Sequence, residues 1–140
     1  RPVDFTIGPD DDVRALVAQR AATAPVACLL VDEAQFLSPQ QVDDLLRIAV
    51  LDEVPVLAYG IRTDFQTVAF PGSRRLLEIA HSLEELKTIC RCGRKAVFNG
   101  RRVGDAFIFD GDQVAIDGVD VHYESLCASC YLQESGGRLA

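Results

Sequence analysis

Residues Val26–Phe36 read VACLLVDEAQF, and this stretch decides the fold. An unbroken apolar run ends abruptly in two carboxylates, an amide and an aromatic ring. Such a run predicts a strand that is buried on both faces, which is typical of parallel α/β sheets. Ligands bind in the crevice beyond the carboxyl ends of such strands, so Asp32 and Glu33 are expected at a site.

The two acids allow two interpretations. In a Walker B strand the first carboxylate holds Mg²⁺ and a neighbouring acid handles water or a hydroxyl, which assigns these roles to Asp32 and Glu33. Alternatively, Asp32 only caps the helix that is expected to start near Ser38. Because acids are common at strand ends, the strand alone leaves both interpretations open.

The flanking sequence predicts one βαβ unit with its site at the tops of the strands. Apolar residues recur at helical spacing after Ser38, and a second short apolar run is closed by Gly60. The pair Pro71-Gly72 is expected in a polar loop, and Cys28 is expected to be a buried core thiol. The expected strands cover residues 26–31 and 54–59, and the expected helices cover residues 12–23, 38–50 and 74–81.

Composition restricts the class of protein. The net charge of −7 and the pI near 4.7 argue against a broad nucleic-acid surface, which needs clustered Lys and Arg. The apolar stretches are far too short for a membrane span, so a cytoplasmic protein without membrane partners is expected. The chain contains no Met and begins with Arg1, which suggests an internal fragment or a trimmed chain.

Two close cysteine pairs, Cys90 with Cys92 and Cys127 with Cys130, flank a Gly-punctuated segment of alternating apolar residues. Four thiolates can surround one Zn²⁺ in a closed structural site, and the segment between the pairs would form the ribbon. Two disulfides are the competing interpretation, although a reducing compartment favours the metal.

Three separated motifs, in order, resemble the type II thymidine kinase family: DEAQF at 32–36, YGIRTDFQTVAFPGSRRLLEIAHSLEELKTICRCGRKA at 59–96 and YESLCASCY at 123–131. The resemblance implies transfer of the ATP γ-phosphoryl group to the 5′-hydroxyl of thymidine or deoxyuridine. It also implies a P-loop-type parallel sheet, present here in part, and a zinc-ribbon domain carrying a lasso loop over the nucleoside. The expected domains are 1–88 and 89–134, followed by a disordered tail at 135–140. Feedback inhibition by dTTP and a homotetramer are further expectations from the family.

The resemblance assigns residue roles one position at a time. Asp32 matches the magnesium-associated acid, and Glu33 matches the general base that accepts the hydroxyl proton. The lasso arginines Arg101 and Arg102 are interpreted either as phosphate contacts or as solvated side chains. The substrate-binding positions are Gln35, Phe36, Ile61, Phe65, Phe70, Asn99, Ala115, Ile116 and Tyr123, and the metal ligands are Cys90, Cys92, Cys127 and Cys130.

One motif that this chemistry requires is absent from the 140 residues, namely GxxxxGK followed by Ser or Thr. The chain alone is therefore not expected to be catalytically competent, and truncation before Arg1 or a catalytically inactive relative would each explain the absence. Two other classes stay open from the residues. DEAQ also fits a DExx-type ATPase acting on nucleic acid, and the cysteine pairs fit a zinc-ribbon interaction module without enzymatic activity.

Overall fold

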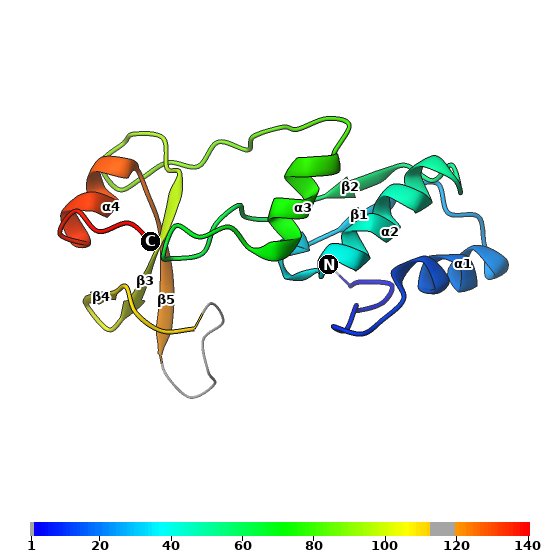
Figure 1. The fold of residues 1–140 in the computed structure, drawn as a ribbon, viewed down its shortest axis with the longest axis horizontal. Helices are drawn as coiled ribbons and strands as arrows, with labels where there is room; N and C mark the ends of the chain where they lie inside the picture. The colour runs from blue at the N-terminus through cyan, green and yellow to red at the C-terminus, as the bar shows by residue number, and fades with distance from the viewer. Residues whose placement is uncertain (1, 113–119) are drawn as a thin grey trace. The chain divides into compact units, whose positions relative to one another are not determined.

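The computed structural model describes residues 2–112 and 120–140, and their contacts form two compact units. Unit 1 comprises Arg1–Arg62 and Phe70–Leu83, and unit 2 comprises Thr63–Ala69 and Glu84–Ala140. The chain therefore crosses between the units three times, which differs from the single expected boundary after residue 88. Figure 1 follows the chain by colour through both units.

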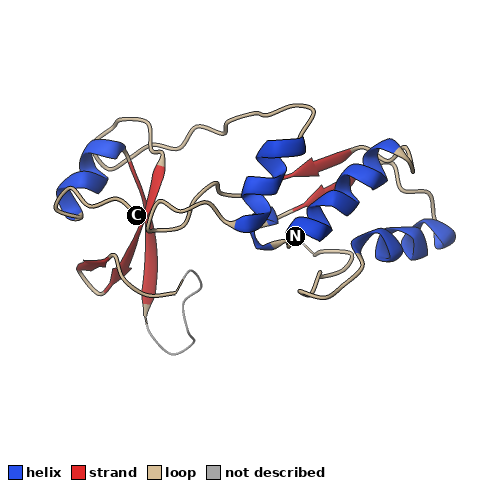
Figure 2. Cartoon of the chain, viewed as in Figure 1, coloured by secondary structure: helices blue, strands red, loops and turns tan. Residues whose placement is uncertain are grey.

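Unit 1 contains a two-stranded parallel sheet of β1 (Leu29–Val31) and β2 (Val56–Ala58). Leu30 pairs with Leu57 at the centre of the register. The chain between the strands forms a 3-10 turn, η1 (Ala34–Phe36), and then helix α2 (Pro39–Val50). This arrangement, drawn in Figure 2, confirms the predicted parallel βαβ unit.

In this chain the strand is buried on one face, and burial on both faces is not observed among the described residues. Leu30 is 62 % exposed, and Leu57 and the thiol of Cys28 are exposed as well. Among the described residues, the helices of unit 1 pack on the face that carries Leu29, Val31 and Val56. Successive side chains of a strand point to opposite faces, so the alternate positions do not enter this core.

Local sequence explains where the first two helices begin. Helix α1 (Val13–Thr23) starts after Asp12, whose carboxylate accepts a hydrogen bond from the Ala15 N–H at 2.8 Å. Helix α2 starts after Ser38 with a reciprocal capping box, in which the Ser38 and Gln41 side chains satisfy each other's backbone N–H groups. The Gln41 amide also donates to the Gly8 carbonyl at 2.8 Å, which ties the N-terminal segment to α2.

Helix α3 (Pro71–Ile79) begins three residues earlier than predicted, so Pro71 and Gly72 form its first turn rather than a loop. Proline is favoured at this position because its missing N–H has no partner inside the helix. Gly72 packs directly against the η1 region, where a Cβ atom would lie 2.3 Å from the Leu37 carbonyl oxygen. Only glycine allows this close approach of two backbones.

Unit 2 is built on a three-stranded antiparallel sheet of order β4-β3-β5 and a short helix. The strands are β3 (Phe98–Val103), β4 (Ala106–Ile108) and β5 (Val121–Leu126), and the helix is α4 (Ala128–Glu134). The first hairpin turns at Gly104, whose φ of 59° lies in the left-handed region. Tyr131 and Leu126 are fully buried at the centre of the unit.

The C-terminal residues make defined contacts in unit 2, although the sequence predicts a disordered tail there. Arg138 forms an ion pair with Asp110 at 2.7 Å, and the Ala140 N–H donates to the Thr67 hydroxyl at 3.3 Å. The contact partners Asp110 and Thr67 lie far from the tail in sequence, so the composition of the tail does not predict these contacts. No helix in the described part of the chain combines the length and apolar character needed to cross a membrane.

Candidate functional site

The predicted acids lie where two parallel strands end. Asp32 and Glu33 directly follow β1, and the Tyr59 N–H donates to the Val31 carbonyl at 2.8 Å. The Ala34 N–H then donates to the Tyr59 carbonyl, also at 2.8 Å. Both carboxylates are exposed at this edge. The end of β1 and the end of β2 therefore form one continuous edge, in agreement with the expected position of a ligand site.

Glu33 has a left-handed backbone conformation with φ of 52°, which is unfavourable for a residue with a Cβ atom. Its N–H donates to the Asp32 carboxylate at 2.9 Å, and its own carboxylate accepts a hydrogen bond from the Gln35 amide. Backbone strain of this kind costs about 1–3 kcal/mol and is found preferentially at functional sites. The second acid is therefore held both by its backbone and by a side-chain partner.

Gln35 connects η1 to the segment that follows β2. Its side chain is buried, its amide donates to Glu33, and its carbonyl oxygen accepts from the Ile61 N–H at 3.3 Å. A Cβ atom on Gly60 would lie 2.6 Å from this oxygen, so the glycine leaves the space that the amide fills. Gln35, predicted beside the nucleoside, thus has both ends of its amide bound within unit 1.

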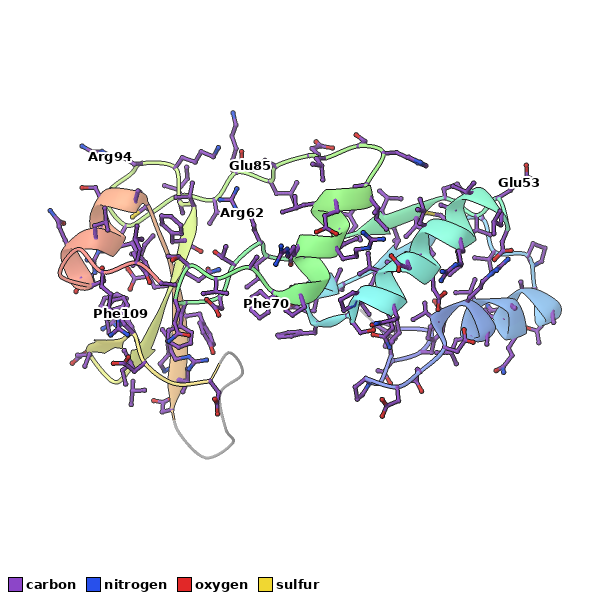
Figure 3. The ribbon with its side chains drawn as sticks, viewed as in Figure 1. Glu53, Arg62, Phe70, Glu85, Arg94 and Phe109 are labelled. Atoms are coloured by element: carbon purple, nitrogen blue, oxygen red, sulfur yellow. The ribbon has the colours of Figure 1, made fainter. Side chains whose placement is uncertain are left out.

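Two phenylalanines and one isoleucine of the predicted set lie in the same unit. The rings of Phe36 and Phe70 meet edge to face, with centroids 5.6 Å apart and an interplanar angle of 81°. Phe36 is exposed, whereas Phe70 is buried. Phe70 directly precedes α3, where Figure 3 labels it. Ile61 is also exposed, and its carbonyl accepts a hydrogen bond from the Ser73 hydroxyl. Unit 1 thus offers apolar surface from Phe36 and Ile61.

Phe65 belongs to unit 2 and is only 1 % exposed. The guanidinium of Arg101 lies 3.6 Å from its ring centroid, and the Tyr131 hydroxyl donates to the Phe65 carbonyl at 2.6 Å. In this structure the ring has almost no free surface for a ligand. Phe65 is therefore a core residue of unit 2, although its place in a polar loop suggested a wall for a base.

The other predicted residues of unit 2 lie on the sheet or outside the described residues. Asn99 lies in β3 opposite Ser125, and Tyr123 lies in β5 opposite Arg101 with 54 % of its surface exposed. Alternation along β3 places Asn99 and Arg101 on the same face of the sheet. Two further predicted positions, Ala115 and Ile116, are not among the described residues.

Arg101 is a residue whose surroundings the sequence did not reveal. It is 6 % exposed, so it is not the solvated loop side chain that one interpretation expected. It lies in β3, stacks on Phe65, and donates from Nε to the Tyr123 hydroxyl at 3.2 Å. The contact between Arg101 and Tyr123 follows from the pairing register of β3 with β5, which the separate strand patterns do not predict.

Four cysteine thiols converge in unit 2. The Sγ atoms of Cys90, Cys92, Cys127 and Cys130 all lie within 4.8 Å of one another, and the Cys92 and Cys127 sulfurs are 3.6 Å apart. Tetrahedral zinc with bonds of about 2.3 Å places its sulfur ligands about 3.8 Å apart. The donor set and the spacing therefore fit one tetrahedral ion, and a cluster of four mutually close thiols could hold a metal.

A tight turn and a helix start bring these thiols together. Cys90 and Gly93 close a turn in which the Gly93 N–H donates to the Cys90 carbonyl at 2.8 Å, and Gly93 has a left-handed φ of 84°. Cys127 caps α4, and its sulfur accepts from the Cys130 N–H at 3.4 Å. The first pair thus lies on a turn, and the second lies at the N-terminus of a helix.

The electrostatics of the cluster favour partial ionisation. Hydrogen bonds from the N–H groups of Cys92 and Cys127 lower the pKa of the Cys90 thiol to about 6. The Cys130 N–H likewise lowers the pKa of Cys127, whereas the Cys92 sulfur and burial raise the pKa of Cys130 to about 12. Metals bind the thiolate form, so the lowered pKa values of Cys90 and Cys127 suit these two residues as ligands.

These features define a mixed α/β protein in which a small parallel sheet ends in two acids and a separate unit carries four thiols that could hold a metal ion. A family model described as thymidine kinase matches residues 10–131. The chain belongs to the thymidine kinase family. This confirms the resemblance and favours a kinase over the DExx-type ATPase interpretation.

Curated relatives agree with the family match. The thymidine kinase of Ruegeria pomeroyi is 48 % identical over 129 residues, and the alignment covers 91 % of this chain and 65 % of the relative. The thymidine kinase of Mesorhizobium japonicum is 50 % identical over 127 residues, covering 90 % and 62 %. That of Chromobacterium violaceum is 48 % identical over 106 residues, covering 75 % and 57 %. The chain thus spans less than two thirds of the length of these relatives.

Proposed function

We propose that the full-length protein is a thymidine kinase that transfers the γ-phosphoryl group of ATP to the 5′-hydroxyl of thymidine or deoxyuridine. The observation that carries this proposal is the pair Asp32 and Glu33 at the shared carboxyl edge of β1 and β2, in a chain of this family. Phosphoryl transfer depends mainly on positioning and charge neutralisation, and an edge of this kind supplies fixed acids for both.

Glu33 is the general base in this proposal and accepts the proton of the 5′-hydroxyl. The hydrogen bond from Gln35 and the strained backbone support the role because both restrict where the carboxylate can lie. A base must stay within hydrogen-bond reach of the proton that it accepts, so restricted motion favours the reaction. Gln35 then acts by positioning Glu33 in addition to its proposed place beside the nucleoside.

Asp32 would hold Mg²⁺. One of its carboxylate oxygens accepts from the Glu33 N–H, and its exposed position is open to solvent, which suits an ion bound through one carboxylate and phosphate oxygens. When bound, the ion neutralises charge on the phosphates of ATP. Asp32, which would hold the ion, is therefore the direct chain neighbour of the proposed base.

We propose nucleoside-binding residues in each unit separately. The exposed apolar surfaces of Phe36 and Ile61 suit a flat pyrimidine. The buried Phe70 ring packs edge to face against Phe36 and so supports it. Unit 2 would add Tyr123 and the chain around it. The remaining proposed contact positions in unit 2 are Asn99, Ala115 and Ile116, whereas Phe65, whose ring is buried, would act only by supporting its neighbours.

The four cysteines would hold a structural Zn²⁺, and this proposal is supported by their mutual distances and by the N–H groups that stabilise thiolates. A P-loop-type nucleotide-binding domain that contains unit 1, and a zinc-ribbon domain that contains the cysteine cluster of unit 2, are the matching proposal for the organisation of the chain. A cytoplasmic homotetramer inhibited by dTTP completes it.

The test is ATP-dependent phosphorylation of thymidine by the full-length protein, with zinc counted on the same sample. We expect turnover and about one zinc per subunit. Zinc without turnover would indicate a catalytically inactive nucleotide-binding relative or an interaction module. Tight, salt-sensitive binding of single-stranded DNA without nucleoside turnover would instead favour an ATPase that acts on nucleic acid.

A further inference from the structure

Arg101 is a buried cation in unit 2, and its surroundings are aromatic. Its guanidinium carbon lies 3.6 Å from the centroid of Phe65 and 5.7 Å from that of Tyr123, and the residue is 6 % exposed. A desolvated charge needs such compensation, which a guanidinium obtains from ring faces and from hydrogen bonds. The arginine is therefore held by specific partners rather than solvated.

The three residues form an ordered series from the interior to the surface. Phe65 is the fixed base of the series, since its ring is fully covered and its carbonyl accepts from the Tyr131 hydroxyl at 2.6 Å. Arg101 lies on that ring. Tyr123 lies directly across the β3–β5 ladder from Arg101 and is 54 % exposed, so only the last member of the series offers substantial surface to a ligand.

The hydrogen bond between Arg101 and Tyr123 has a defined direction. Guanidinium nitrogens can only donate, so the Nε–H bond of 3.2 Å uses the tyrosine oxygen as an acceptor. The hydroxyl hydrogen of Tyr123 is then available for an acceptor outside this pair. An oxygen atom of a nucleoside is such an acceptor.

We propose that Arg101 is a positioning residue that fixes the exposed Tyr123 ring and directs its hydroxyl as a hydrogen-bond donor toward a nucleoside oxygen, with Phe65 as the support. The inference rests on the proposed thymidine kinase function, because it places Tyr123 at the nucleoside. It gives Phe65 a role in substrate binding that its burial otherwise excludes.

Arg102, the next residue of β3, provides a matched control. Its guanidinium also lies over a phenylalanine, 5.4 Å from the Phe107 centroid, and it pairs with Glu124 at 3.3 Å and Asp105 at 3.2 Å. Alternation along the strand puts it on the opposite face from Arg101. A change at Arg102 therefore removes a similar stacked cation without touching Tyr123.

The experiment measures steady-state kinetics of the full-length enzyme with thymidine and ATP varied separately. Arg101→Met and Tyr123→Phe are each expected to raise the KM for thymidine about tenfold or more, because each removes a charge-assisted hydrogen bond. The KM for ATP should stay within about twofold, because the series reaches no phosphate site in this proposal. Arg101→Lys should behave like Arg101→Met, since an ammonium keeps the charge but lacks the planar stacking group. Arg102→Met should leave both constants unchanged.

The decisive readout is the double variant Arg101→Lys with Tyr123→Phe. If the two residues act as one unit, the double variant raises the KM for thymidine no more than the larger single change. Multiplicative effects, or an equal rise in the KM for ATP, would overturn the role of Arg101. Melting temperature and zinc content are compared for every variant. If Arg101→Met fails to fold, the comparison of Arg101→Lys, Tyr123→Phe and their double variant still tests the proposal. An unmodified enzyme without thymidine turnover would overturn the proposed function and this inference together, whereas normal turnover with independent effects would overturn only the inference.

Discussion

At the scale of single residues, Glu33 combines a strained backbone with a side chain held by Gln35. A carboxylate with these restraints loses little freedom when a hydroxyl arrives, which is the condition for an efficient proton acceptor. The same residue in a relaxed loop would visit many other positions. The proposed role of Glu33 as the base would give the strain a functional explanation, which a capping role for Asp32 does not provide.

The Glu33→Gln variant of the full-length enzyme tests this role. The amide keeps the size of the side chain but cannot accept the proton, so we expect turnover to fall about 10²- to 10⁴-fold. Thymidine binding, measured by isothermal calorimetry, should be nearly unchanged because the shape of the site is preserved. Turnover at the original rate would remove Glu33 as the base.

Glu53 offers a matched control for this variant. It is also an exposed glutamate with a left-handed backbone, φ 55°, and it lies in the turn between α2 and β2 (Figure 3). Glu53→Gln therefore makes the same chemical change in the same backbone conformation away from the sheet edge. Its turnover should equal that of the unmodified enzyme, and a loss there would point to a general effect of the substitution.

The sequence was sufficient to predict site residues that are adjacent along the chain. It was insufficient to predict contacts between residues that are far apart in sequence. Asp32 and Glu33 could be located because an apolar run and two acids are adjacent in the sequence. Phe65 and Arg101 could not be related, because their contact depends on how a loop packs against β3. The exposure of Cys28 was also missed, since an apolar run does not show which face of a strand has helices packed on it.

At the scale of elements, the position of α3 depends on contact between two backbones. Gly72 lies in its first turn, where a Cβ atom would be 2.3 Å from the Leu37 carbonyl oxygen and 3.0 Å from that of Gln35. This contact places the start of α3 against the turn that carries Gln35. Periodicity located the body of the helix but not its first turn, because Pro-Gly is also a common loop signal.

The Gly72→Ala variant should lower the free energy of unfolding by about 1–3 kcal/mol, because the methyl group meets backbone that cannot rotate away. Chemical denaturation of the full-length protein checks this value. Gly8→Ala is the control, since its Cβ would meet only the end of the Asp11 side chain at 3.2 Å. We expect a change within about 0.5 kcal/mol there. Equal stability of the two variants would contradict the close approach at α3.

The cluster of four cysteines is also a property of elements, because a turn and a helix start supply its four sulfurs. Replacing Cys127 and Cys130 by Ser should abolish zinc binding and destabilise unit 2, since metal binding and folding are coupled in small metal sites. Metal content by mass spectrometry and thermal unfolding would show both effects. The control is Cys28→Ser, at an exposed cysteine in unit 1, which should retain the metal. Full zinc content after the double replacement would exclude this cluster as the site.

At the scale of the whole molecule, the three chain crossings make unit 2 discontinuous in sequence. Thr63–Ala69 contributes the fully buried Phe65, the Gln66 amide that donates to the Phe109 carbonyl at 3.0 Å, and the Thr67 hydroxyl that accepts from Ala140. A seven-residue loop thus fills the interior of a unit whose other residues begin at Glu84.

A protein with a specific protease site inserted after Leu83 tests this organisation. Cleavage should leave both pieces together in size-exclusion chromatography, because the loop remains packed in unit 2. Adding Phe65→Ala to the cleaved protein should make the pieces separate, since truncation of a buried phenylalanine costs about 3–5 kcal/mol. Immediate separation without that substitution would show that the loop contributes little to the unit.

The discontinuity also limits how this protein can be recombined with its relatives. An exchange of the cysteine-containing unit between two family members must transfer two stretches, Thr63–Ala69 and Glu84–Ala140, as one block. A chimera joined only near residue 84 would combine the Phe65 loop of one parent with the Arg101 and Tyr131 of the other. Among family members, substitutions in the loop Thr63–Ala69 should therefore be accompanied by substitutions in β3.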